Sequence, residues 1–384
     1  MKYRAISLIF FTGALIFTPI SAYVSVPLLL SAFIFLLISR YKITLNLLDK
    51  MQLALMGAVF LATIFAVYKG HSLLCSVVFI GYILSYFLAR SLLNDEKSVI
   101  KIVSWLSYTT LMISIIGIVQ YFTKFNLVIK DVPVIVLKGK RISSICYNPL
   151  ILASYLAFLL PVFVAFFIKG YKRVLLGATI CLGLVAFFFT MSRGPTIGLI
   201  VSLTVLIYLL VRKKLIAVAL PVALIAACFL FTPLRSRFIR TLDPVTDIAR
   251  KVTVVPGIRM WKDHSILTGV GVHNFYLLYE KYCFPGYAGE PHYIHCMYLN
   301  FLVETGIIGL SVLIAIFIII IRWSWQIYKG NSDFKGWIAV ALFSSFLGFL
   351  VHNIVDNTPY VVGLGLLFWA GMGVISGIHQ ERSA

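Results

Sequence analysis

Long apolar runs, separated by short polar segments, dominate the chain. A helix that crosses a bilayer needs about 20 predominantly apolar residues. The runs that approach or reach this length are 5–19, 22–39, 51–67, 72–89, 102–122, 150–168, 174–190, 196–211, 215–232, 305–321, 336–354 and 359–378. Apolar residues are continuous within each run and do not alternate with polar ones, which favours helices over barrel strands. The pattern predicts an all-α polytopic membrane protein with about twelve transmembrane helices.

The composition excludes a soluble globular protein. Hydrophobic residues make up 61% of the 384 residues and charged residues 12%, whereas soluble domains have about 45–50% and about 25%. A net charge of +20 would suggest nucleic-acid binding in a soluble protein. Here the basic residues lie in short clusters between apolar runs, as in membrane topology signals. We therefore expect membrane lipids as partners and no nucleic acid.

The distribution of basic residues predicts the orientation. If the amino terminus is cytoplasmic, the short outer connections hold only Lys69 and Arg193, and most basic clusters face the cytoplasm. Lys and Arg in short loops set the orientation, and long loops count for little. We expect both termini in the cytoplasm.

Two longer outer segments, 123–149 and 233–304, offer room for chemistry. They divide the chain into helices of 1–232, an extracytoplasmic catalytic loop with the start of a histidine-bearing helix at 233–304, and helices of 305–384. Segment 233–304 is rich in arginine and aromatic residues, which suits a substrate that is both anionic and sugar-like. Trp261 and Tyr293 are our candidates for glycan contact.

The segment from His295 to Gly309 contains the sharpest local pattern. At 100° per residue, His295, Gly306 and Gly309 share one face of a helix, and the small glycines would let a neighbouring helix approach closely. His295 would lie at the positive end of the helix dipole, which favours the neutral imidazole that a general base needs. The alternative is an interfacial histidine bonded to a loop carbonyl.

Two arginines in the outer connections could bind phosphate. Arg193 lies in Met191-Ser192-Arg193-Gly194-Pro195, where a tight Gly-Pro turn would hold its guanidinium at the membrane surface. The alternative is a snorkelling arginine bound to lipid phosphates. Arg259 precedes Gly269-Val270-Gly271, whose glycines suit a tight turn but lack the spacing of a dinucleotide site.

The histidines and cysteines of the same loop do not predict a metal site. His264, His273, His292 and His295 lack a carboxylate or cysteine at a known ligand spacing, so we expect no metal and no cofactor. Cys283 and Cys296 are both predicted to be extracytoplasmic and could pair in an oxidising compartment.

Four motifs in order resemble the O-antigen ligase and polymerase family of bacterial membrane glycosyltransferases. The family pattern H-[N/S/Q]-x9-G-x-x-G matches the segment from His295 to Gly309 in spacing and departs from it at Cys296. The other three motifs are the R-x-W…G-x-G-x-x-x-F pattern at Arg259, Trp261, Gly269, Gly271 and Phe275, the S-R-G motif at Ser192 to Gly194, and the segment of Arg141, Asn148-Pro149 and Leu160-Pro161. These motifs cover roughly residues 140–310, and the span layout covers the whole chain.

The resemblance implies a metal-independent glycosyl transfer at the periplasmic face of the inner membrane. The donor would be an undecaprenyl-diphosphate-linked glycan. The acceptor would be a sugar hydroxyl of the lipid A core in a ligase, or another lipid-linked glycan in a polymerase. His295 would be the base, and Arg193, Arg259 and Arg141 would bind the diphosphate, because guanidinium groups bind phosphate oxygens bidentately.

A ligase is the favoured interpretation, because the chain is short and has one dominant outer loop before the His295 helix. A polymerase of the same family is the alternative. A flippase or transporter of lipid-linked glycans is the alternative from another class. It would need a polar path through the bilayer, and no ionisable residue lies in the middle of a predicted span.

The orientation can be tested by cysteine labelling in a background where the native cysteines are replaced by serine. We expect a membrane-impermeant reagent to label Ser265→Cys in cells whose outer membrane has been removed, and to leave Ser383→Cys unlabelled. The reverse pattern would invert the topology and place every candidate site residue in the wrong compartment.

Overall fold

The computed structural model describes residues 2–40, 44–129, 132–135, 137–211, 214–230, 235–236, 239, 244–284, 291–331 and 333–383. It confirms an all-α polytopic membrane protein. Helices account for each predicted apolar run: α1 (Lys2–Phe17), α2 (Ala22–Ile38), α3 (Leu47–Ile64), α4 (Lys69–Leu92), α5 (Glu96–Thr123), α6 (Pro149–Lys169), α7 (Arg173–Thr190), α8 (Arg193–Leu210), α9 (Lys214–Leu230), α13 (Met297–Gly330), α14 (Phe334–His352) and α15 (Val362–Ser383).

Nine of these helices, counted over the described ranges, are long and apolar enough to cross a membrane. The other three fall short of 18 residues, because α1 has 16 residues and α2 and α9 have 17 each. The largest departure from the predicted boundaries is α13, which begins at Met297 and not at 305.

The outer segments form small elements of their own. Between α5 and α6 lie the strands β1 (Leu127–Ile129) and β2 (Val132–Ile135), which pair antiparallel, and a short 3₁₀ helix, η1 (Ser144–Cys146). The second long segment contains α11 (Pro244–Asp263) and α12 (Asn274–Tyr282). A second 3₁₀ helix, η3 (Thr358–Tyr360), joins α14 to α15.

Side-chain caps explain where several helices begin. Asn46 and Asp49 form a reciprocal capping box at α3, and Asp95 accepts a hydrogen bond from the backbone of Ser98 at α5. Asn148 caps α6, with Pro149 at the first helical position, where a missing N–H costs nothing. These polar residues satisfy backbone donors that the helix itself leaves free.

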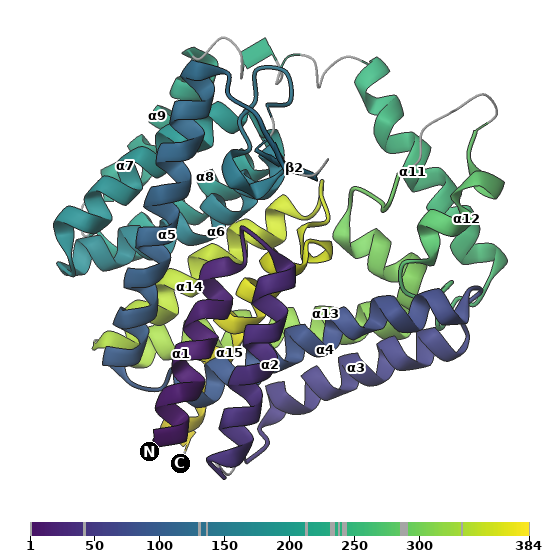
Figure 1. Cartoon of the computed structure of the whole chain (residues 1–384), viewed down its shortest axis with the longest axis horizontal. Helices are drawn as coiled ribbons and strands as arrows, with labels where there is room; N and C mark the ends of the chain where they lie inside the picture. Colours follow the sequence, from purple (N-terminus) through teal and green to yellow (C-terminus); the bar gives the residue numbers. More distant parts are fainter. Residues whose placement is uncertain are drawn as a thin grey trace.

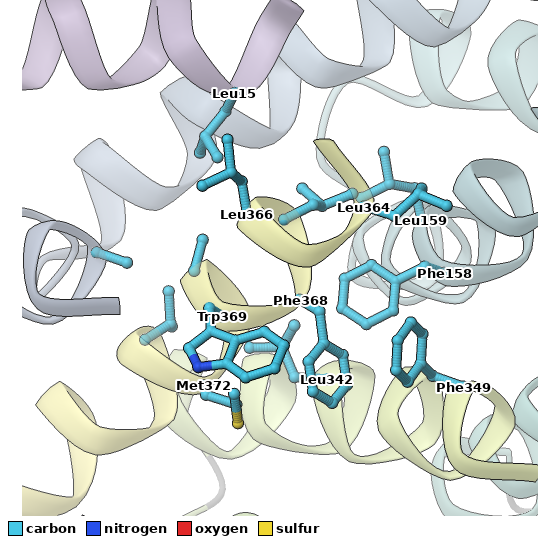
Figure 2. Close-up of a cluster of buried hydrophobic side chains, with 14 of the residues drawn as sticks. Leu15, Phe158, Leu159, Leu342, Phe349, Leu364, Leu366, Phe368, Trp369 and Met372 are labelled. Atoms are coloured by element: carbon cyan, nitrogen blue, oxygen red, sulfur yellow. The ribbon is translucent and has the colours of Figure 1, made fainter. Parts of the chain in front are cut away.

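The core is organised around α15, whose side chains point to several neighbouring helices (Figure 2). Phe368 stacks on Phe349 of α14 at a centroid distance of 4.0 Å, and Trp369 stacks on Tyr82 of α4 at 4.8 Å. The Trp369 indole N–H also donates to the Gln52 side chain of α3 at 2.9 Å. Aromatic contacts and one buried hydrogen bond therefore join α15 to three other helices.

Glycines permit the closest helix contacts. A Cβ atom on Gly198 of α8 would lie 2.6 Å from the Gly348 carbonyl oxygen of α14, and one on Gly348 would lie 2.4 Å from the Gly198 oxygen. Gly373 of α15 lies equally close to the backbone of Tyr86 in α4. Small residues at these crossings allow the dispersion contacts and backbone proximity that drive helix association in lipid.

The two chain termini lie together at one end of the bundle (Figure 1). Arg4 near the amino terminus donates to the Ser91 carbonyl at 2.7 Å, and Gly377 near the carboxyl terminus packs against Arg90. The Arg90 guanidinium is itself buried and paired with Asp49 at 3.0 Å. The two termini are therefore held close together at one end of the bundle, while α11 and α12 lie away from them.

Helix α13 is broken at Gly306, which has φ 65° and ψ −169°. The loop between α11 and α12 fills the break. The backbone N–H groups of Val270 and Gly271 in this loop donate to the Val303 and Glu304 carbonyls at 2.9 and 3.0 Å. The carbonyls of Ile266 and Leu267 accept from Ile307 and Ile308 on the other side. The loop thus replaces the missing helical hydrogen bonds, which a membrane helix cannot leave unsatisfied.

This break corrects the predicted role of Gly306 and Gly309. We expected both glycines to seat a neighbouring helix. A Cβ atom on Gly306 would instead lie 2.2 Å from the Leu267 carbonyl oxygen of the inserted loop, and one on Gly309 would lie 2.0 Å from Thr305 in its own helix. The face shared by His295 and these glycines is therefore not continuous, because the helical rotation is interrupted at Gly306.

Gly306→Ala should destabilise the protein. The backbone conformation at 306 is essentially restricted to glycine and costs other residues about 1–3 kcal/mol, and the added methyl group would collide with the loop. We expect a lower midpoint of thermal unfolding in detergent. Gly57→Ala is the control, because a Cβ atom there has no neighbour within 4 Å and alanine is the better helix former. Equal midpoints for the two variants would contradict the proposed strain at Gly306.

Candidate active site

Arg193 is the first residue of α8 and is half-buried. The chain reverses direction just before it, at Met191, which has φ 49°. The predicted tight turn at Gly194-Pro195 is therefore wrong: both residues belong to the first turn of α8, where proline is tolerated because its N–H would have no helical partner. Arg193 thus lies at the amino-terminal, positive end of a helix dipole.

Arg141 holds this turn in place. Its Nε donates to the Thr190 carbonyl and its Nη2 to the Ser192 hydroxyl, each at 2.9 Å. The neighbouring Ile142 N–H donates to the Phe189 carbonyl. The structure therefore brings Arg141 and Arg193 together from separate outer segments.

The start of α8 contacts the end of α14. A Cβ atom on Gly194 would lie 3.0 Å from Cδ2 of the His352 ring. His352 is buried, and its Nε2 lies 3.1 Å from Oδ2 of Asp356 in the loop that follows. Gly194, the residue after Arg193, therefore leaves space for the His352 ring at the start of α8.

His295 lies on the other side of the same carboxylate. It precedes α13 by two residues, its side chain is 46% exposed, and its Nδ1 lies 3.8 Å from Oδ1 of Asp356. The Met297 N–H, at the start of α13, donates to the Asn353 and Asp356 carbonyls at 3.0 and 2.8 Å. His295 therefore has a carboxylate neighbour, and not the loop carbonyl of the alternative interpretation.

Asp356 is ionised despite its burial. Burial by itself raises the pKa of this carboxyl group, but the nearby His295 imidazole and hydrogen bonds from His352 and the Asn357 N–H outweigh that effect and hold the pKa below its usual range. A buried carboxylate with these neighbours can orient an imidazole and stabilise its protonated form.

An aromatic row extends from His295. Tyr293 lies edge-on to the His295 ring at a centroid distance of 5.3 Å, and Tyr360 of η3 lies 6.0 Å from Tyr293. The His273 ring packs on Tyr360 at 4.6 Å, and the Tyr360 hydroxyl donates to the buried Glu304 carboxylate. Burial and the adjacent Asp356 raise the pKa of Tyr293 to about 12, so its hydroxyl remains a donor at neutral pH.

His273 is neutral at physiological pH. Burial, with smaller contributions from His71 and His292, lowers the pKa of His273 to about 4. An uncharged ring beside Tyr360 adds polar and aromatic surface to the row without adding positive charge.

Arg259 lies on the adjacent helix α11 and is exposed, with its guanidinium carbon 5.7 Å from the centre of the Phe284 ring. Gly257, one half-turn earlier, packs against Ile294, the residue before His295. Helix α11 therefore carries Arg259 beside the segment that bears the histidine. Trp261 is half-buried, and its indole N–H donates to the Ile266 carbonyl at 3.1 Å.

The cysteines and remaining histidines have separate surroundings. Cys283 and Cys296 are free thiols, so the pairing that we considered does not occur in this structure. His264 is bonded to the Met260 carbonyl, and His292 lies against Tyr276. Across the described residues, no group of three His, Cys, Asp or Glu side chains could hold a metal ion.

Sequence reasoning missed Asp356, His352 and Tyr360. All three lie at or near the short connection between the last two helices, to which we assigned no role from the sequence. A signal was present, since a histidine and an aspartate lie four residues apart in a cluster of polar residues between two apolar runs. Only the fold brings Asp356 beside His295, with His352 on the other side of the carboxylate and Tyr360 against Tyr293.

Residues 177–314 match the family model described as O-antigen ligase. The match runs from α7 through the Arg193 turn, α11 and α12 to the first half of α13. It thus includes His295, Arg193 and Arg259. No curated protein matches the chain.

Proposed function

The chain carries an O-antigen ligase family domain over residues 177–314, and from this premise we propose that it is a glycosyltransferase of the O-antigen ligase type. It transfers a glycan from undecaprenyl diphosphate to a sugar hydroxyl of the lipid A core, at the periplasmic face of the bacterial inner membrane. The proximity of His295 to the buried carboxylate of Asp356, beside the Arg193 turn, is the observation that carries the proposal.

His295 acts as the general base. Asp356 lies on the Nδ1 side of the ring, so Nε2 is the nitrogen available to a substrate at this exposed position. Nε2 takes the proton of the acceptor hydroxyl as its oxygen attacks the anomeric carbon of the donor. The Asp356 carboxylate orients the ring and stabilises the imidazolium that forms.

Arginines stabilise the leaving group. The bond between the anomeric carbon and the diphosphate oxygen breaks, and the diphosphate departs with the electron pair. Arg193 offers a guanidinium at a helix amino terminus, where the dipole also favours an anion. Arg259 adds a second guanidinium, which is exposed, from α11. Arg141 supports the Arg193 turn through two hydrogen bonds and adds its positive charge to the diphosphate site.

The aromatic row suits the sugar. Tyr293 lies next to the base and presents both a ring and a hydroxyl donor. Trp261 is less suited to this role than we expected from the sequence, because its N–H is already bonded and its ring is half-buried in the α11–α12 cluster. We assign glycan contact to Tyr293 first.

The ligase assignment is tested by the lipopolysaccharide of a deletion strain. Complete loss of the capping glycan is the expected result. A single repeat attached to core would indicate the polymerase reaction, in which the acceptor is another lipid-linked glycan.

A second experiment distinguishes the enzyme from the transporter alternative. If the protein is an enzyme, the purified protein in vesicles should form a new covalent product from the labelled donor. Translocation without a product would overturn the enzyme proposal.

His295→Ala should remove most turnover and leave donor binding nearly intact, because the base acts on the acceptor hydroxyl. A positioned general base contributes about 10²–10⁴-fold. Product formation and donor affinity are measured on the purified variant. His292→Ala is the matched control, an exposed histidine three residues earlier. Loss of donor binding in His295→Ala would contradict the assignment.

Arg259→Lys should weaken both donor binding and turnover. Lysine keeps the charge but loses the bidentate geometry, and the diphosphate is present in the ground state and gains charge as it leaves. The same two measurements apply, with Lys262→Ala on the same helix as the control. Behaviour identical to the unaltered protein would remove Arg259 from the diphosphate site.

Activity should survive EDTA, because arginines supply the charge that a metal ion would otherwise provide. The measurement is the rate of product formation after chelation and again after adding back Mg²⁺ or Zn²⁺. Loss on chelation with recovery on re-addition would argue for a metal ion and against the arginine proposal.

A further inference from the structure

The Asp356 carboxylate is shared between two imidazoles. His295 faces Oδ1 and is exposed, whereas His352 faces Oδ2 and is buried. The proposed reaction uses His295 and leaves His352 without a role. His352 is nearly inaccessible to solvent and contacts the same carboxylate as His295, which suggests that it has a role in the site.

The packing fixes the His352 ring. His352 is the last residue of α14, and its Cβ and ring lie against Gly198 and Gly194 of α8. Any side chain on Gly194 would meet the ring at 3.0 Å. The ring is therefore confined between the start of α8 and Asp356.

We propose that His352 is a positioning residue that acts on His295 through Asp356. It donates from Nε2 to Oδ2 and so holds the carboxylate with Oδ1 directed at His295. This inference rests on the proposed role of His295 as base.

The hydrogen bond has two consequences for the carboxylate. First, a buried carboxylate oxygen that loses its donor is left with an unpaired charge in a low-dielectric site, so the group would reorient or move. Second, the bond from His352 withdraws charge from Asp356, which limits how strongly Asp356 favours the imidazolium form of His295. A base must be neutral before it can accept a proton, so this limit keeps it competent at neutral pH.

The other charged and titratable groups of the candidate site are left unaltered in the experiment. They are Arg193 on α8, Tyr293 before α13, Glu304 on α13, Tyr360 on η3 and His273 at the start of α12. A change in pH dependence after substitution at 352 alone is then attributable to the Asp356 bridge.

The test compares His352→Gln with His352→Leu. Glutamine places an N–H donor at the same number of bonds from Cα as histidine Nε2, whereas leucine fills similar space without a donor. We expect His352→Gln to retain most turnover and the unaltered pH profile. His352→Leu should lose about 10- to 100-fold in turnover, the size expected for a hydrogen bond to a charged group. The acid limb of its profile should move to higher pH, because the unshared carboxylate then favours imidazolium at His295. Donor affinity should be unchanged.

A double-substitution cycle separates positioning from packing. In an Asp356→Asn background, His352→Leu should cost little further turnover, since the carboxylate through which it acts is gone. Ser345→Ala controls for altered packing, because Ser345 is buried on the same helix, two turns from His352. If His352→Leu does not accumulate, His352→Asn takes its place, because its shorter amide cannot reach Oδ2.

Three results would overturn the proposal: equal activity and pH profiles for the glutamine and leucine variants, a full loss from His352→Leu in the Asp356→Asn background, or a loss of donor affinity. Failure of the proposed function is recognised separately. It would appear as normal turnover in His295→Ala, whatever the variants at 352 do.

Discussion

The break in α13 is the constraint on which the site depends. A helix interrupted near the membrane surface exposes backbone groups that must find partners. The loop before α12 supplies them on both sides of Gly306, and its Val270 carbonyl also accepts a hydrogen bond from the Val67 N–H, just after α3. The same hydrogen bonds therefore anchor α11, α12 and the His295 segment to the transmembrane bundle. Backbone pairing therefore orders this region, and the side chains of the candidate site are attached to the backbone that it holds in place.

The second organising feature is a buried carboxylate. Asp356 joins the end of α14 to the start of α13 through its backbone and to two imidazoles through its side chain. Burial alone raises the pKa of such a group, and the hydrogen-bond donors around Asp356 lower the pKa and keep the carboxyl group ionised. The carboxylate lies beside one ring nitrogen of His295, and the proposed role of this histidine as a base rests on that geometry.

Positive charge reaches this region from separate parts of the chain. Arg193 comes from the start of α8, Arg141 from the segment before α6, and Arg259 from α11. Their partners differ: Arg141 is tied into the turn before α8, whereas Arg259 is exposed beside an aromatic ring.

The sequence by itself determined the fold class, the approximate helix ranges and part of the set of residues from which the site is drawn. Continuous apolar runs leave little choice in a bilayer, because only helices satisfy their own backbone there, and caps such as Asn46 and Asn148 fix where helices begin. Local pattern also selected His295 and Arg193. The tertiary structure decided the partners: Asp356 and His352 approach His295 because α8, α13 and α14 pack together, and no local periodicity records that contact. The tertiary structure also decided the role of Gly306. The helical periodicity assumed an unbroken helix, whereas the helix is broken at Gly306 and a distant loop forms hydrogen bonds with the backbone on both sides of the break.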